Sequence, residues 1–195
     1  MKLQLPFYQN ENTLEIAHNL IGKVIVTNFG NAKTSGIIIE TEAYTGIVDK
    51  ASHAYNNKRT ARTEVMFGNP GIAYVYLCYG IHSLFNVVTN KPGEPHAVLI
   101  RNIKPYKGIA QMLQRRGHNK LTNKLTTGPG TVSQALGIHY SNSGESLLGN
   151  KIWIEDCHIQ LDKTKIKVTP RIGVSYAGDH ALLPYRFVIN SNDIN

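Results

Sequence analysis

Hydrophobic and polar residues alternate along most of this chain in short runs that predict β-strands. The runs are rich in β-branched residues and are separated by residues that favour turns. Near the start, Asn12 followed by Glu15 resembles a capping box, and Gly22 can end a helix, so we predict a helix between Asn12 and Gly22. The predicted strands are 23–29, 35–44, 72–78, 83–89, 97–103, 151–157, 167–174 and 185–190.

After Pro105 the spacing of apolar residues changes to that of a helix. Three apolar residues lie on one stripe of the segment 108–117, which we predict to be helical. A Gly-Pro-Gly turn then leads into a second short predicted helix within 127–137. Because strands outnumber helices and their connections are short, we predict a single α+β domain over residues 1–195 with mostly antiparallel pairing.

The predicted strands 72–78 and 83–89 flank Tyr79 and Gly80 like the two arms of a hairpin. A side chain at a two-residue tip would be exposed, and such turns favour Asn, Asp or Gly. Tyr79 therefore does not suit a packing role. On a basic protein, an exposed ring at a protruding tip is suited to enter a minor groove and fill the gap left by a displaced base.

The charge of the chain indicates a polyanionic partner. Its 195 residues include 21 Lys and Arg against 13 Asp and Glu, for a formal net charge of +8. From Pro95 to Gly144 there is no Asp or Glu. A generally basic protein with no nucleic-acid role is the competing interpretation. The cations of this stretch are Arg101, Lys104, Lys107, Arg115, Arg116, Lys120 and Lys124.

Apolar runs and cysteines indicate the setting of the protein. No run of about 20 uninterrupted apolar residues occurs, so we expect no membrane span. The segment from Met1 to Asn12 lacks an apolar run of signal-peptide length, so we expect no secretion signal. Cys78 and Cys157 make neither a disulfide framework nor a zinc site. We therefore expect a cytoplasmic protein.

Candidate chemistry gathers in the segment 37–55. Glu40, Glu42 and Tyr44 are spaced by two residues at the end of a predicted strand, so their side chains share a face. A carboxylate beside a buried strand and near aromatic rings is a candidate general base. The competing interpretation is that both glutamates are ordinary strand-end carboxylates paired with lysines.

Two further polar residues interrupt apolar runs. Arg101 follows four apolar residues, so its guanidinium is expected at the edge of the core. It needs an anionic partner there, either a carboxylate such as Glu42 or a phosphate, unless it only extends its charge into solvent. Asn86, if buried, must be hydrogen-bonded, either to neighbouring backbone or to a ligand in a pocket.

Five blocks of sequence, taken in order, resemble one known family. The blocks "ETEAY", "MFGNPGIAYVYLCYG", "LIRNIKP", "GPGTVSQALGI" and "RIGVSYAG" are similar to those of the alkyladenine type of 3-methyladenine DNA glycosylase. No single block is decisive, whereas five in register are specific. The similarity runs from about Phe7 to Val188, which is nearly the whole chain.

The resemblance implies an α+β domain with a curved, mostly antiparallel sheet, flanking helices and a protruding hairpin. It implies a base-excision repair enzyme that flips alkylated purines such as 3-methyladenine, and in some relatives hypoxanthine, out of double-stranded DNA. The enzyme would cut the N-glycosidic bond and leave an abasic site. The resemblance further implies a monomer that needs no cofactor or metal and that associates with the nucleoid in the cytoplasm.

The resemblance also implies roles for individual residues. Glu42 would be the general base that activates water, and Arg101 would orient it. The base pocket would have Tyr44 as one wall, His53 and Tyr76 as the other, and Asn86 and Leu99 in its lining. Within the pocket, Asn86 would discriminate against guanine through the exocyclic amine of that base.

The remaining implied roles concern the DNA around the lesion. Tyr79 would intercalate, and Arg115, Arg116 and Lys120 would hold phosphates without reading sequence. His82 departs from the pattern, because some relatives carry a tyrosine at its position.

Two other functions stay open on the residues alone. Glu40, Glu42, Asp49 and His53 could ligate a divalent ion in a metal-dependent nuclease, although their spacing matches no standard metal motif. The other possibility is a protein that binds nucleic acid without catalysis. Within the glycosylase class, an amine nucleophile would require a lysine, and none lies in "ETEAY" or "YVYLCYG", so we favour water as the nucleophile.

Overall fold

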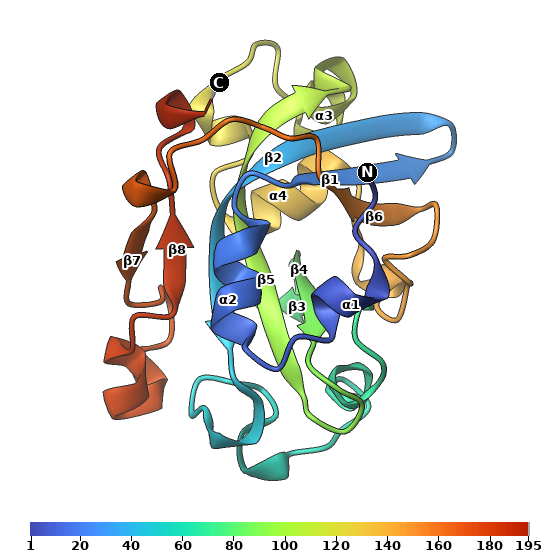
Figure 1. Cartoon of the computed structure of the whole chain (residues 1–195). Coiled ribbons are helices and arrows are strands. Elements are labelled where there is room, and N and C mark those ends of the chain that lie inside the picture. Colours follow the sequence, from blue (N-terminus) through green and yellow to red (C-terminus); the bar gives the residue numbers. More distant parts are fainter. Residues whose placement is uncertain (195) are drawn as a thin grey trace.

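The computed structural model describes residues 1–194, and a curved antiparallel sheet runs through its centre (Figure 1). The strands pair in the order β3-β4-β5-β2-β1-β6, and β8 pairs with both β2 and β7. Every pairing among these strands is antiparallel. The strands are β1 (Val24–Phe29), β2 (Ala32–Tyr44), β3 (Ala73–Cys78), β4 (His82–Thr89), β5 (His96–Lys107), β6 (Ile152–Glu155), β7 (Lys167–Thr169) and β8 (Arg186–Val188).

Short helices pack around this sheet, which confirms the predicted α+β class (Figure 1). The α-helices are α1 (Leu5–Tyr8), α2 (Thr13–Leu20), α3 (Ile109–Arg116) and α4 (Pro129–Leu136). The 3₁₀ helices are η1 (Gly46–Val48), η2 (Tyr55–Asn57), η3 (Glu64–Phe67), η4 (Asn123–Leu125), η5 (Tyr140–Asn142), η6 (Lys163–Lys165), η7 (Ser175–Leu182) and η8 (Ser191–Asp193). No helix within residues 1–194 has the length and apolar character needed to cross a membrane.

Several predicted elements are confirmed and others need correction. Helix α2 begins at the predicted cap, where the Asn12 side chain accepts a hydrogen bond from the Glu15 amide at 3.2 Å. The capping box is only half formed, because the Glu15 carboxylate accepts from the Asn10 side chain instead. The prediction of a strand over 167–174 is wrong beyond Thr169, since the following proline has no amide hydrogen to donate to a ladder.

Strand β2 is the longest strand and carries the candidate residues. Its first half pairs with β1, its second half pairs with β8, and its other edge pairs with β5. Thr41 donates its hydroxyl to the carbonyl of Ala17 in α2 at 2.8 Å. Because neighbouring residues of a strand point to opposite faces, Glu42 and Tyr44 lie on the face turned away from α2.

A row of side chains crosses the sheet on that face. Glu42 is paired with Leu99 of β5, Leu99 with Asn86 of β4, and Asn86 with Tyr74 of β3. Paired residues of adjacent antiparallel strands share a face. Strand register alone therefore brings the candidate base onto one surface with Leu99 and Asn86, two of the residues predicted to line its pocket.

The predicted hairpin of β3 and β4 is confirmed, but its loop is one residue longer than expected. Cys78 pairs with His82, which leaves Tyr79, Gly80 and Ile81 in the loop rather than a two-residue tip. The Ile81 amide donates to the Cys78 carbonyl at 3.2 Å. Tyr79 and Gly80 both have positive φ, at 52° and 72°, as the tight turns that close hairpins require.

Candidate active site

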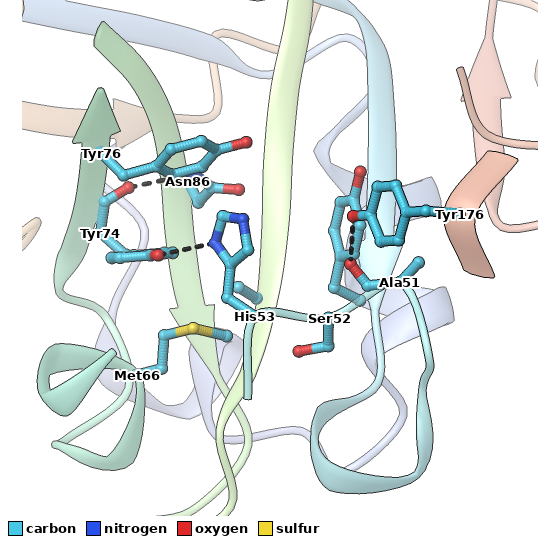
Figure 2. A pocket seen from close by; sticks show the side chains of 10 residues that line it. Ala51, Ser52, His53, Met66, Tyr74, Tyr76, Asn86 and Tyr176 are labelled. Atoms are coloured by element: carbon cyan, nitrogen blue, oxygen red, sulfur yellow. Dashed lines mark hydrogen bonds between the residues drawn. The ribbon is translucent and has the colours of Figure 1, made fainter. Parts of the chain in front are cut away.

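An aromatic cavity opens over the row of side chains described above (Figure 2). Four of the five residues predicted for a base pocket lie in its lining, which is a result of strand register and of the loop after β2. The lining is made by Tyr44, Ala51, Ser52, His53, Met66, Tyr74, Tyr76, Asn86, Ala97 and Tyr176.

His53 and Tyr76 form one side of the cavity. Their ring centroids lie 4.6 Å apart at an interplanar angle of 82°, an edge-to-face contact. The Tyr74 hydroxyl hydrogen-bonds to His53 Nδ1 at 2.8 Å, which fixes the orientation of the imidazole (Figure 2). This placement agrees with the pair of residues that the resemblance assigns to a single wall.

The imidazole of His53 is held neutral. Burial is the main cause of the lowering of its pKa to about 4, and the nearby charges of Arg62 and Lys58 act in the same direction. A neutral imidazole adds no positive charge to the cavity at neutral pH. His53 itself therefore presents a ring that does not repel a cationic ligand.

Glu42 lies beside the cavity with its carboxylate fully buried. The Tyr44 hydroxyl donates to Glu42 Oε2 at 2.8 Å, and the Ile172 amide donates to Oε1 at 2.8 Å. Burial raises the pKa of Glu42, and this effect is only partly opposed by the positive charge of Arg101 and by the two hydrogen bonds. The carboxyl group thus combines a raised pKa with donors that fix both of its oxygens.

Arg101 pairs with two carboxylates rather than with one. Its Nε donates to Glu40 Oε1 at 2.9 Å and lies 3.4 Å from Glu42 Oε1. Arg186 donates to the same Glu40 oxygen at 2.7 Å. The anionic partner expected for Arg101 is therefore a carboxylate in this structure. Glu40 pairs with two arginines rather than with lysines.

The Glu42 carboxylate does not itself open onto the cavity. Glu42 has no exposed surface and is not part of the cavity lining, whereas Tyr44, which lines the cavity, reaches it through the hydroxyl. The structure therefore shows a closed site, in which the hydroxyl of Tyr44 connects the buried carboxylate to the cavity.

Asp49 and His53 do not join Glu40 and Glu42 as metal ligands. Arg171 binds Asp49 through a two-pronged ion pair at 2.5 and 2.9 Å, and His53 Nδ1 bonds to Tyr74. Within residues 1–194, no group of three or more His, Cys, Asp or Glu side chains is arranged to hold a metal ion. This geometry does not support the nuclease alternative.

Asn86 lines the cavity, whereas Leu99 does not. The Asn86 amide nitrogen donates to the carbonyls of Tyr74 and Leu84 at 3.1 and 3.2 Å, so its buried side chain is anchored by backbone while it lines the cavity. Leu99 is buried between Glu42 and Asn86 in the sheet and is not among the cavity-lining residues. Leu99 therefore supports the row of side chains from within the sheet.

The hairpin tip presents Tyr79 to solvent, with 91% of its surface exposed. His82 is also exposed, and it lies against α4, where a Cβ on Gly130 would come within 3.1 Å of it. The tip is therefore braced at its base by α4 and free at its end.

The cations predicted to hold phosphates are not equally free to do so. Arg115 donates to Thr34 and to the Ala135 carbonyl, and Arg116 donates to the Leu125 carbonyl and to Gln134. Both guanidinium groups thus tie α3 to α4 and its surroundings. Lys120 is exposed in the following loop. Contact between these three residues and DNA stays a prediction.

Sequence reasoning missed several residues at the site. Arg171 and Ile172 belong to the block "RIGVSYAG", whose spacing marks no single residue as functional, and Tyr176 of the same block lines the cavity. Lys58 and Arg62 were also missed, although they are the two ends of the visibly basic segment "KRTAR".

The neutral state of His53 predicts a specific pH dependence of stability. Because the folded pKa of about 4 is below the ordinary value of 6.5, the unfolded chain takes up this proton first. The stabilising contribution is complete above the ordinary pKa and is lost as pH falls towards the folded pKa. Between about pH 8 and about pH 5, the free energy of unfolding should fall by about 2 kcal/mol more in the wild type than in His53→Gln.

Urea unfolding of both proteins at each pH measures this difference. His53→Gln keeps every other acid-sensitive group, so the difference between the two proteins isolates the contribution of His53. An identical loss of stability in the two proteins would contradict a neutral, buried His53.

Comparisons with known proteins agree with the geometry. A family model described as methylpurine-DNA glycosylase (MPG) matches residues 6–193. A protein of Chlamydia felis is 48% identical over 185 residues, which cover 94% of each chain. Proteins of Oceanobacillus iheyensis and Bacillus cytotoxicus are 42% identical over 186 residues and 43% identical over 201 residues.

These alignments span almost all of every chain compared. They cover 95% of this chain and 91% of the Oceanobacillus protein, and 98% of both chains for Bacillus cytotoxicus. Each of the three relatives carries the name "Putative 3-methyladenine DNA glycosylase". The resemblance drawn from the five sequence blocks is thereby confirmed, and the chain belongs to the methylpurine-DNA glycosylase family.

Proposed function

We propose that this protein is a DNA repair enzyme that removes alkylated purines, such as 3-methyladenine, by hydrolysing their N-glycosidic bond. The observation that carries the proposal is the buried Glu42 carboxylate, which the Tyr44 hydroxyl joins to an aromatic cavity. Membership of the methylpurine-DNA glycosylase family supports the same conclusion. One chain supplies the whole cavity, so we propose that the protein acts as a monomer.

The cavity suits a cationic purine that has been flipped out of the duplex. The electron-rich faces of Tyr44 and Tyr76 attract a positively charged ring, with a cation–π contribution of about 1–2 kcal/mol in a desolvated site. Neutral His53 completes the wall without repulsion. An uncharged lesion such as hypoxanthine gains stacking but not this attraction, so it should be a weaker substrate.

Hydrolysis uses Glu42 as the general base. As the bond between the sugar C1′ and the purine nitrogen breaks, its electron pair leaves with the purine and neutralises the cationic ring. The oxygen of water bonds to C1′, and Glu42 accepts the proton that this water loses. The carboxylate also stabilises the positive charge that develops on the sugar.

Glu42 must be uncovered before it can act. Its carboxylate is fully buried in the closed arrangement, so entry of the flipped nucleotide has to admit a water to it. The cavity lining includes no lysine, which favours water over an amine as the nucleophile.

Tyr79 supplies the other half of base flipping. Extrusion of a nucleotide leaves a gap in the stack and costs a few kcal/mol. The exposed ring at the hairpin tip can fill that gap from the minor groove, while the paired strands β3 and β4 keep it in place.

A basic loop beside the cavity is suited to hold the phosphates of the damaged strand. Lys58 and Arg62 are exposed, and their charges act on His53 in the cavity wall. Neither forms an ion pair with another described residue, whereas Arg59 between them is neutralised by Glu64 at 2.6 Å. We therefore assign phosphate binding first to Lys58 and Arg62.

The variant Glu42→Gln should lose base release by about 10²-fold or more, because the amide cannot accept the proton from water. The measurement is chromatography of purines released from methylated duplex DNA, together with the affinity for that duplex, which should persist. The matched change Glu40→Gln removes a neighbouring charge without removing the proposed base, so it should retain measurable release. Undiminished excision by Glu42→Gln would refute its role.

The variant Tyr79→Ala should weaken binding of a lesion-containing duplex by about tenfold, since base–aromatic stacking contributes about 1–3 kcal/mol. Binding of the free damaged base, which leaves no gap to fill, should not change. Tyr106→Ala removes another exposed tyrosine, at the far end of β5, and should alter neither affinity. Equal losses for duplex and free base in Tyr79→Ala would argue against intercalation.

The double variant Lys58→Gln/Arg62→Gln should lower the salt dependence of duplex binding. Each lost phosphate contact reduces the slope of log affinity against log salt by about 1. Arg59→Gln, which removes a cation already paired with Glu64, should leave the slope unchanged. Fluorescence titrations at several salt concentrations measure both slopes, and equal slopes for wild type and double variant would place the phosphates elsewhere.

A further inference from the structure

We propose that Arg171 is a positioning residue that holds both walls of the cavity and the candidate base in their working arrangement. The proposal rests on the function assigned above to Glu42 and the cavity. Arg171 contacts neither the flipped base nor the sugar in this account, and it acts through the residues that do.

The guanidinium of Arg171 is fully engaged at its terminal nitrogens. Nη1 donates to Asp49 Oδ2 at 2.5 Å and to the Ala43 carbonyl at 2.9 Å. Nη2 donates to Asp49 Oδ1 at 2.9 Å and to the His180 carbonyl at 3.1 Å. Both side chains of the Arg171–Asp49 pair are completely buried. Four acceptors from three segments therefore meet one rigid fork.

The same group packs on one wall of the cavity. The guanidinium carbon lies 4.8 Å from the ring centroid of Tyr44 and 5.2 Å from that of Tyr185. A cation stacked on a ring restricts its tilt. Arg171 thus sets the position of Tyr44, whose hydroxyl reaches Glu42.

Asp49 carries the effect of Arg171 to the opposite wall. Its carboxylate also accepts from the amides of Thr45 and Ala51, at 3.1 and 3.0 Å. These bonds fix the loop that follows β2 and leads to His53. The Tyr176 hydroxyl donates to the Ala51 carbonyl at 3.0 Å, so the segment after Arg171 grips the same loop (Figure 2).

The backbone next to Arg171 completes the arrangement. The Ile172 amide donates to Glu42 Oε1, so the chain position set by Arg171 also sets a donor to the base. Displacing a group by about 1 Å near the reacting atoms can cost about 10²-fold in rate. A buried pair that fixes three parts of the site at once is therefore expected to govern the rate of the chemical step.

The test replaces the planar guanidinium of Arg171 with a side chain that keeps the positive charge. Arg171→Lys retains one positive group but cannot span both Asp49 oxygens and both carbonyls. In single-turnover assays on methylated duplex, the rate constant for base release should fall about 10²-fold, while the duplex affinity should stay within about threefold of wild type. Asp49→Asn, which weakens the same pair from its other side, should act in the same direction and serves if Arg171→Lys does not fold.

A second readout does not depend on activity. Exchange of the Ile172 amide hydrogen, followed by NMR, should become at least about tenfold faster in Arg171→Lys, while amides of β1 keep their protection. Lys23→Met breaks the part-buried ion pair between Lys23 and Asp156, on a segment that contributes no residue to the cavity, and should change neither the rate constant nor Ile172 exchange.

The outcomes separate this inference from the proposed function. A folded Arg171→Lys protein with wild-type rate and wild-type Ile172 exchange would overturn the inference and leave the function intact. A wild-type protein that releases no purine would refute the function, and Ile172 exchange would still decide whether Arg171 positions the site.

Discussion

A carboxylate enclosed in the middle of a sheet is stable only where donors and positive charge meet it, and the surroundings of Glu42 are organised by that requirement. Desolvation of an ionised carboxylate is costly, and hydrogen bonds and an ion pair have to offset most of the cost. The partners of Glu42 are Tyr44, Arg101 and the Ile172 amide. Because they belong to different parts of the chain, the fold must close completely before the carboxylate is satisfied.

The hydrogen bonds and the positive charge around Glu42 do not fully offset the cost of burying its carboxylate. Burial still raises its pKa despite the opposing partners, so the group is a better proton acceptor than an exposed glutamate. Asp49 shows the opposite result with similar burial, because its contacts with Arg171 outweigh desolvation and lower its pKa. The raised pKa of Glu42 suits the proton transfer proposed for it, whereas Asp49 is held as a charged partner of Arg171.

The sequence predicts the parts of this arrangement that depend on local spacing. Alternation places Glu42 and Tyr44 on one face of β2, and the turn position exposes Tyr79. Charge counting cannot tell which cations already have partners: Arg115 is predicted to hold a phosphate, and its Nη1 donates to Thr34 and to the Ala135 carbonyl. The pairing of Arg171 with Asp49 also cannot be predicted from local sequence, because the two residues lie 122 positions apart. Long-range pairing of this kind leaves no periodic pattern to read.

We propose that Glu42 activates water once a flipped nucleotide opens the site. The most direct test of this proposal is a crystal structure of the protein bound to duplex DNA in which a cationic pyrrolidine replaces the sugar of the lesion, as a mimic of the charge that develops during bond breakage. In that complex we expect the Glu42 carboxylate to be uncovered and to hold a water, within about 3 Å, against the face of the pyrrolidine ring. A bound complex in which the Glu42 carboxylate stays fully buried, with no water in contact with it, would contradict its role as the base.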